Sequence, residues 1–343
     1  MLFGLFIGLS NVSGLVDEDN IAWQSEDVVF TRPRIYEFIF TSMERLNTMF
    51  RSQGDSSIEK KRRSYGVGLI NFLKHLTYLP GVSRLVFRLR LARILRQFYY
   101  WLAHPPGDVI HVEVGGLTAN FYVHTPWELR SLESAGGLGH EQHILELLIS
   151  KVRPGDVIYD IGSNFGIYSI LLSKAVGPNG TVIAVEPEEQ SYNHLQENLQ
   201  LNALTNIRSF RLALGDQNGE AKLFLGQVTG ASSLMRTHQV HGYQVVGIIE
   251  GDWLVEREKL PLPRLVKIDV EGYEYVVIQG LSQTLRQPTC ELVCCEIHPQ
   301  LLPGKQKPEG IFDMLRSLGF NQIDIYQRGT IEYHVFAHRE MVQ

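Results

Sequence analysis

The sequence predicts an α/β fold built on a parallel sheet, and two neighbouring stretches of the chain carry this prediction. Residues 156–161 hold a run of apolar residues, as in a strand buried on both faces, and a glycine loop and a helical stretch at 165–175 follow. Residues 181–185 form a second apolar run after the turn at 176–180, and the acid Glu186 ends it. Strand, loop, helix and strand together make one parallel unit, which is typical of α/β proteins.

The glycine loop after the first strand is suited to bind a ligand. Asp160 ends that strand, and Gly162 and Gly166 bracket a tight turn where two missing side chains let a ligand approach the backbone. Glu186 comes 24 residues after Gly162, at the end of the second strand, where an acid accepts hydrogen bonds from the two hydroxyls of a ribose. The two features together predict a nucleoside pocket.

The order of the loop residues distinguishes between nucleoside cofactors. Dinucleotide sites have the pattern G-x-G-x-x-G, whereas this chain has Asp160-x-Gly162-x-x-x-Gly166. An acid at the first position repels phosphate but attracts the amino group and the cation of a sulfonium ligand. This loop, together with Glu186, looks like the S-adenosylmethionine (SAM) site of the Rossmann-like methyltransferases.

Further elements follow the alternation of apolar and polar residues along the chain. We expect a hairpin at 108–123, helices at 128–135, 141–152 and 190–201, and strands at 207–212, 221–225 and 243–249. Asp216 follows the strand at 207–212, where it is expected to bond an adenine amino group or to serve only as a turn acid.

A second polar stretch lies at residues 265–274. If these residues form one strand, Lys267, Asp269 and Glu271 share one face. Charges on a buried central strand are costly unless they are paired or used. We therefore predict a functional role for Asp269 above all, with a structural pairing to Lys267 as the alternative.

The last predicted strand, at 291–298, repeats this pattern with Glu296 and His298 on one side. If it neighbours the strand that carries Lys267, the charged groups of both strands meet at the C-terminal edge of the sheet.

These motifs resemble the FkbM family of SAM-dependent methyltransferases over roughly residues 126–337. The resemblance is carried by the segments 160–166, 186–187, 213–216, 230–234, 267–274 and 296–298. It implies a Rossmann-like seven-stranded sheet flanked by helices, and methyl transfer from SAM, commonly to oxygen, on natural products, sugars or glycolipids. The family often has Gly-Ala-Asn where this chain has Gly162-Ser163-Asn164, a departure that leaves cofactor binding intact.

Motifs and resemblance together name ten candidate site residues. Cofactor binding is expected of Asp160, Gly162, Asn164, Gly166, Glu186 and Asp216, and catalysis of Asp269, Lys267, His298 and Glu296. A hydroxyl acceptor must lose a proton, so Asp269 or His298 is predicted as the base, with Lys267 stabilising the alkoxide. No metal is assigned, although oxygen and imidazole ligation leaves open a divalent ion held by Asp269, Glu296 and His298.

Composition divides the chain into two parts. Residues 60–107 hold ten Lys or Arg and no acid, although the chain has a formal net charge of −5. We predict a mainly helical, basic N-terminal extension at 1–107 and a methyltransferase domain at 108–343. Basic residues between apolar ones at 60–104 favour either helices packed on the catalytic domain or peripheral contact with an anionic membrane.

Net acidity argues against a nucleic-acid partner, so we expect a small-molecule, glycan or glycolipid acceptor. The three cysteines, Cys290, Cys294 and Cys295, lack a paired C-x-x-C pattern, which argues against zinc and indicates buried core residues. An apolar start too short for a bilayer predicts a cytoplasmic protein, at the inner face of the membrane if residues 60–104 bind lipid.

Two other functional classes stay open. An NAD-dependent oxidoreductase or epimerase of Rossmann type shares the strand-end acid but lacks G-x-G-x-x-G. A non-catalytic SAM-binding or scaffold protein has no reason to keep buried charges at 265–274.

Overall fold

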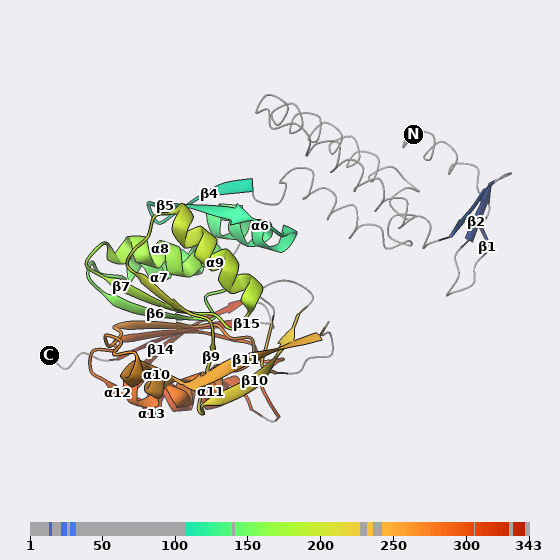
Figure 1. Ribbon diagram of the computed structural model, residues 1–343. Coiled ribbons are helices and arrows are strands. Elements are labelled where there is room, and N and C mark those ends of the chain that lie inside the picture. The colour runs from blue at the N-terminus through green and yellow to red at the C-terminus, as the bar shows by residue number, and fades with distance from the viewer. Residues whose placement is uncertain are drawn as a thin grey trace. The chain divides into compact units, whose positions relative to one another are not determined.

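The structure is a computed structural model of the 343-residue chain. It describes residues 14–15, 22–25, 28–31, 108–138, 141–226, 232–235, 242–304, 306–328 and 332–339. The chain divides into two compact units, Met1–Pro105 and Pro106–Gln343 (Figure 1). In the first unit, strands β1 (Gly14–Leu15), β2 (Ala22–Ser25) and β3 (Val28–Thr31) pair antiparallel, and the predicted basic segment lies outside the described residues.

A seven-stranded sheet forms the centre of the second unit, in the order β14-β15-β13-β12-β6-β7-β8. Its strands are β6 (Val157–Ile161), β7 (Thr181–Val185), β8 (Ile207–Phe210), β12 (Leu265–Ile268), β13 (Leu292–Ile297), β14 (Gln322–Arg328) and β15 (Glu332–His338). All pairs from β8 to β13 are parallel, and β15 is antiparallel to both of its neighbours. The predicted Rossmann-like sheet of seven strands is confirmed.

Helices cover both faces of this sheet (Figure 1). One face carries α7 (Glu141–Ser150), α8 (Ile167–Val176) and α9 (Glu189–Leu201), and the other carries α10 (Gly251–Arg257), α11 (Glu274–Gly280), α12 (Ser282–Arg286) and α13 (Pro308–Ser317). Alternate residues of β6, β7 and β12, among them Tyr159, Val185 and Val266, share one buried core with Val277 of α11 and Leu315 of α13. Because both faces are covered, the central strands are buried along their whole length.

The predicted hairpin is present as β4 (Asp108–Val114) and β5 (Leu117–Val123), followed by α6 (Pro126–Glu133) and a π-helix (Ser134–Leu138). Helix α6 begins with a capping box, in which Thr125 accepts from the Glu128 N–H and Glu128 accepts from the Thr125 N–H. Helix α9 holds the hairpin, because the Asn198 Oδ1 accepts from the Tyr122 N–H at 2.8 Å.

The predicted strand at 207–212 was wrong at its end. Strand β8 stops at Phe210, and residues 213–215 form β9 (Ala213–Gly215) in a second sheet with β10 (Gly219–Leu225) and β11 (Gly242–Glu250). The cause is a change of partner: β8 pairs with β7, whereas β9 pairs in parallel with β11 through Ala213 and Ile248.

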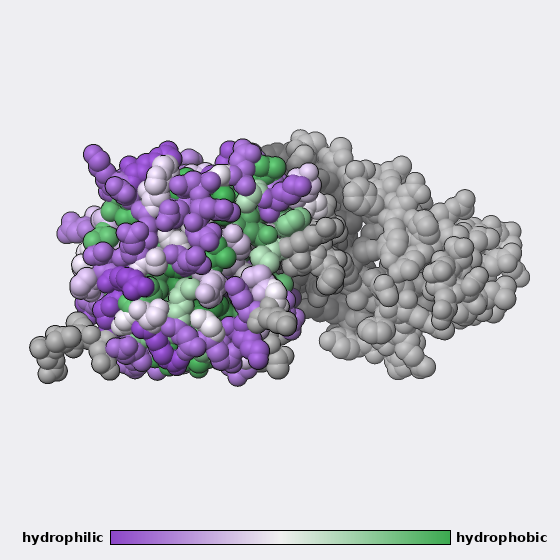
Figure 2. Space-filling model, turned by 90° about the horizontal axis from the view of Figure 1, so that it is seen from below, coloured by the Kyte–Doolittle hydropathy of each residue, from purple (hydrophilic) through white to green (hydrophobic). Residues whose placement is uncertain are grey.

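Hydrophilic side chains cover most of the described surface in the view of Figure 2, with separate hydrophobic areas between them. Among the helices that the structure describes, none is long and apolar enough to cross a membrane. The three cysteines are buried free thiols in and beside β13, as their sequence context predicted.

Candidate active site

The glycine loop after β6 crosses the end of β12 at close range. Gly162 has φ 81°, and a Cβ at this position would lie 1.7 Å from the Asp269 carbonyl oxygen. The N–H groups of Gly162 and Ser163 both donate to the Val185 carbonyl, at 2.9 and 3.0 Å. Only glycine fits here, and the loop is held to the C-terminal ends of both β7 and β12.

Glu186 lies directly after β7 and is buried. Its Oε2 accepts from the Asn164 N–H and its Oε1 accepts from the Glu188 N–H, both at 2.8 Å. Burial raises the pKa of this carboxyl to about 8, although the two N–H groups act in the opposite direction. Each oxygen keeps a lone pair for a further donor, which is the capacity that two ribose hydroxyls require.

A cavity opens at this edge of the sheet, with an empty volume of ≈ 620 Å³ that includes its solvent-facing part. Gly162, Asn164 and Glu186 line it on the side of β6 and β7, and Asp269 and Glu271 line it on the side of β12. Its apolar wall is formed by residues including Leu212, Leu214, Leu223, Leu234 and Tyr273.

These groups fit SAM: an apolar wall suits adenine, a strand-end acid suits ribose, and the loop at Gly162 leaves room beside its backbone. Three residues of the apolar wall, Leu214, Leu234 and Tyr273, lie in segments of the family resemblance, whereas Leu223 was not foreseen from the sequence. Leu223 comes from β10 of the second sheet, and periodicity along the chain does not show which sheet a strand joins.

Three of the six predicted cofactor residues do not line the cavity. Asp160 is fully buried behind the loop, where its Oδ2 accepts from the Ser169 hydroxyl at 2.5 Å. Gly166 has φ 98° and packs against Leu195, so it serves the turn into α8. Asp216 follows β9 in the second sheet.

Lys267 lies on β12 between two acids. Its Nζ is 3.3 Å from the Asp269 Oδ2 and 3.4 Å from the Asp160 Oδ1, and it stands 4.5 Å from the centre of the Tyr168 ring. Burial lowers the pKa of Lys267, but Asp269 and Asp160 outweigh it, so the net shift is upward. Burial likewise raises the pKa of Asp269, but Lys267 and His298 bring it below its usual value. Lys267 and Asp269 therefore form an ion pair, and its acidic member, Asp269, lines the cavity.

The prediction that the strand continues through Glu271 was wrong. Strand β12 ends at Ile268, and Glu271 has φ 51° in a turn that Gly272 completes with φ 96°. The Ser233 hydroxyl donates to the Glu271 carbonyl at 2.5 Å. Glu271 therefore reaches the cavity through left-handed backbone and not through strand alternation. Burial raises the pKa of its carboxyl to about 7.

His298 follows β13, which pairs with β12 as predicted, with Cys294 opposite Lys267. The imidazole Nδ1 is 3.0 Å from the Glu274 Oε1, and Nε2 lies 3.7 Å from Glu271 and 3.6 Å from Glu296. Burial lowers the pKa of His298, but the hydrogen bond to Glu274 and the charge of Glu271 raise it well above its usual value.

Burial and the charge of Asp269 raise the pKa of Glu296 well above its usual value. The predicted convergence of the charged groups at one edge of the sheet is present, because β12 and β13 pair in parallel and end at the same edge. Of the four predicted catalytic residues, Asp269 lines the cavity, whereas Lys267, Glu296 and His298 are not among its lining residues.

Comparison with known proteins gives the following similarities. Residues 160–321 match the family model of the Methyltransferase FkbM domain. The chain is 29% identical over 208 residues to Hexuronic acid methyltransferase AglP of Haloferax volcanii, which covers 59% of this chain and 81% of that protein. It is 28% identical over 145 residues to Methyltransferase 1 of Beauveria bassiana, over 36% of this chain and 58% of that protein.

Two solved structures are similar to this chain. One is a SAM-dependent O-methyltransferase from Thermotoga maritima, with 14% identity, a TM-score of 0.38, and coverage of 69% of this chain and 79% of that chain. The other is precorrin-6y C5,15-methyltransferase from Geobacter metallireducens, with 14% identity, a TM-score of 0.38, and coverage of 58% and 89%.

Proposed function

We propose that this chain is a SAM-dependent methyltransferase of the FkbM family and that it transfers the methyl group to a hydroxyl oxygen of a sugar, free or within a glycolipid. The match of residues 160–321 to the Methyltransferase FkbM domain and the similarity to a hexuronic acid methyltransferase support this proposal. The observation that carries this proposal is that Glu186 and Asp269 line one cavity from two different strands. Glu186 is suited to accept hydrogen bonds from the ribose hydroxyls, and Asp269 is suited to accept the proton of an acceptor hydroxyl. The oxidoreductase alternative has no matching feature in the loop at Gly162.

In this proposal, the residues on the β6 and β7 side hold the cofactor. Glu186 accepts from the ribose hydroxyls, and the Asn164 N–H holds Glu186 in place. The missing side chain of Gly162 leaves room for the ligand beside the loop, and the leucines of the apolar wall contact the adenine. Asp160 acts from behind the loop by holding Lys267. SAM supplies an electrophilic methyl group on a sulfonium, so the task of the protein is alignment and removal of one proton.

Asp269 is the proposed base, because among the predicted catalytic residues it lines the cavity. The acceptor O–H bond breaks and its proton passes to the Asp269 carboxylate. Bound SAM would supply the methyl group for the new O–C bond, and the electron pair of the broken S–CH₃ bond would stay on its sulfur. Lys267 orients Asp269 through its 3.3 Å contact, and His298 is a positioning residue.

The acceptor class is supported by the relative named as a hexuronic acid methyltransferase. Sugars present hydroxyls without acidic protons, and a carboxylate within reach of such a hydroxyl is the general base that methyl transfer to oxygen requires. Uronic acids and glycans or glycolipids that contain them are therefore the first acceptors to test.

The test has two stages, on the same purified chain. Calorimetric titration with SAM and with a nicotinamide dinucleotide should give saturable binding of SAM alone. Transfer of labelled methyl from SAM to uronic acid acceptors should then fall by about 10²–10⁴ in Asp269→Asn, while SAM affinity stays within a few-fold. Unchanged turnover in Asp269→Asn would contradict the role of Asp269, and the absence of SAM binding by folded protein would contradict the proposed function.

A further inference from the structure

Asp269, Glu271 and His298 each offer one ligand atom, and these three atoms lie within 4.8 Å of one another. Asp269 and Glu271 also line the cavity, so these two side chains are open to an acceptor. We propose that these three side chains bind a divalent cation, Mg²⁺ or Mn²⁺, at the acceptor side of the cavity. The set differs from the one that the sequence left open, because Glu271 takes the place of Glu296.

His298 is oriented as a metal-binding histidine is. Its Nδ1 is engaged by Glu274, which directs Nε2 toward the carboxylates of Glu271 and Glu296. The distances from Nε2 to these oxygens, 3.7 and 3.6 Å, are too long for hydrogen bonds. They match ligands of one ion, which lie roughly 3–4 Å apart when each is about 2.1 Å from the metal.

In the part of the chain that the structure describes, two buried polar atoms of this arrangement lack a hydrogen bond. His298 is 7% exposed, and within the described residues its Nε2 makes no hydrogen bond. Glu274 is fully buried, and its second oxygen also has no hydrogen-bond partner among the residues that the structure describes. A carboxylate that holds the far nitrogen of a metal-binding imidazole is the usual outer support of such a site.

The charged groups around these side chains also support a bound cation. Two basic side chains, Lys267 and His298, contact five acids: Asp160, Asp269, Glu271, Glu274 and Glu296. Lys267 is enclosed by Asp160 and the Oδ2 of Asp269, so it leaves the other oxygen of Asp269 to a different partner. Among the described residues that line the cavity there is no Lys, Arg or His, so a bound cation would add positive charge on the cavity side of these acids.

The role of the ion rests on the proposed function. The sequence predicted that Lys267 stabilises the acceptor alkoxide, but its ammonium does not line the cavity. A cation on Asp269, Glu271 and His298 would coordinate the acceptor oxygen and supply this stabilisation. It would also reduce the repulsion between an acidic sugar and the acidic wall of the cavity.

The experiment titrates the full-length chain with Mn²⁺ alone, after removal of metal by a chelator and dialysis, and counts free Mn²⁺ by electron paramagnetic resonance. Wild type should show one saturable site. Glu271→Gln and His298→Ala should weaken it at least tenfold, and Glu274→Gln by about 10–100-fold because it removes the outer support.

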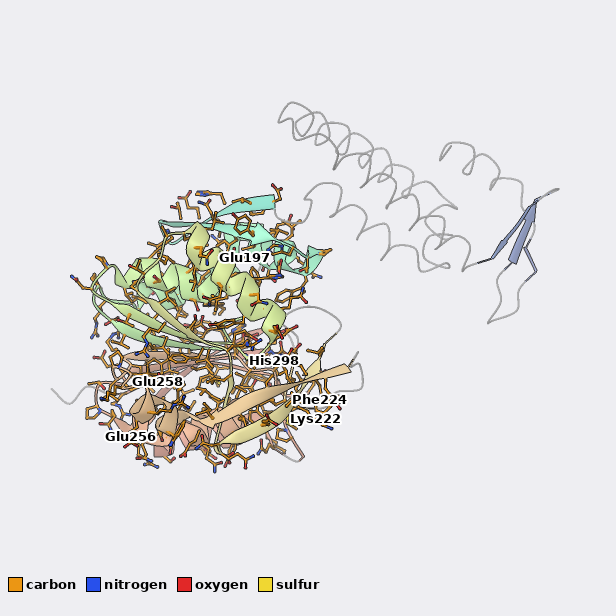
Figure 3. All side chains as sticks on the ribbon, viewed as in Figure 1. Glu197, Lys222, Phe224, Glu256, Glu258 and His298 are labelled. Carbon is orange, nitrogen blue, oxygen red and sulfur yellow. The ribbon has the colours of Figure 1, made fainter. Side chains whose placement is uncertain are left out.

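Glu197→Gln is the matched control. Glu197 also pairs with a histidine, His124 at 2.7 Å, but on helix α9, well apart from His298 (Figure 3). This variant should bind Mn²⁺ as wild type does, and circular dichroism checks that each variant is folded. Glu271, which is only partly buried, keeps the test valid if His298→Ala fails to fold.

Absence of saturable Mn²⁺ binding in folded wild type, or equal affinity in Glu271→Gln and Glu197→Gln, would overturn the cation site. Methyl transfer at full rate in the presence of the chelator, combined with no Mn²⁺ binding, would overturn it while the proposed function stands. If Mn²⁺ affinity in wild type and the variants followed the expected order but no methyl transfer were detected, the cation site would stand and the proposed function would be contradicted.

Discussion

Glu186 couples cofactor binding to protonation. Burial raises its pKa to about 8, so at neutral pH the free protein holds a proton on this carboxyl. Ribose hydroxyls donate to the ionised form and favour it. We therefore expect SAM binding to release protons below pH 8, and SAM affinity to rise with pH and to level off above pH 8.

Calorimetry in buffers with different ionisation enthalpies measures this proton release directly. Glu186→Gln is the control, because it removes the contribution of the protein and leaves the titration of SAM itself. Equal proton release in wild type and Glu186→Gln would show that Glu186 does not titrate on binding.

Comparison of two glycines distinguishes how a close contact and how backbone conformation affect stability and SAM affinity. Gly155 and Gly162 have φ 86° and 81°, but a Cβ at Gly155 meets nothing within 4 Å, whereas a Cβ at Gly162 meets the Asp269 carbonyl. Gly155→Ala should cost roughly 1–2 kcal/mol of unfolding free energy and leave SAM affinity unchanged. Gly162→Ala should cost more and abolish SAM binding.

Urea unfolding and SAM titration of both variants check this prediction. If the two variants lost equal stability and both kept SAM affinity, the close crossing of the loop over β12 would have no role in the site.

Helix α9 connects the hairpin to the cofactor loop through one side chain. Asn198 is fully buried, accepts from the Tyr122 N–H at 2.8 Å and donates to the Phe165 carbonyl at 3.0 Å. Asn198→Ala leaves both backbone groups without this partner and should lower the unfolding free energy by about 2–4 kcal/mol. SAM affinity should also fall, because Phe165 lies within the glycine loop.

Asn193→Ala is the control for this element, since Asn193 is exposed on the same helix. It should change the unfolding free energy by less than about 0.5 kcal/mol. Equal loss of stability in the two variants would mean that general helix propensity, and not the bridge from α9 to the loop, explains the effect.

At the scale of the whole molecule, we make a separate prediction for each of the two compact units. All described residues of the cavity belong to the unit Pro106–Gln343. A chain of residues 106–343 should therefore fold and bind SAM with an affinity within a few-fold of the full chain. Its failure to bind SAM would show that the first unit contributes to the site.

For residues 60–104 the sequence leaves two interpretations open, peripheral contact with an anionic membrane or helices packed on the catalytic domain, and the first of these can be tested directly. Sedimentation with anionic and with neutral liposomes at low salt should show binding of the full chain to anionic liposomes alone, lost at high salt. The chain of residues 106–343 should not sediment. The absence of liposome binding by the full chain would favour the alternative, in which these basic residues belong to helices packed on the catalytic domain.

The sequence by itself determined the α/β class, the strand–loop–helix unit at Asp160 and the acid at Glu186. These features depend on local periodicity and on glycines at fixed spacing, which neighbouring residues decide. It also identified the pairing of Lys267 with Asp269, because a charge on a buried strand requires a partner nearby.

Tertiary structure alone decided which of these residues face the ligand. It moved Asp160 behind the loop, brought Leu223 from a second sheet into the cavity, and set Glu271 opposite His298. Each of these outcomes depends on strand order, or on the left-handed turn at Glu271, which bring together residues far apart in the chain. A pattern of residues along the chain does not contain that information, because it is the packing of one strand against another that selects the neighbours.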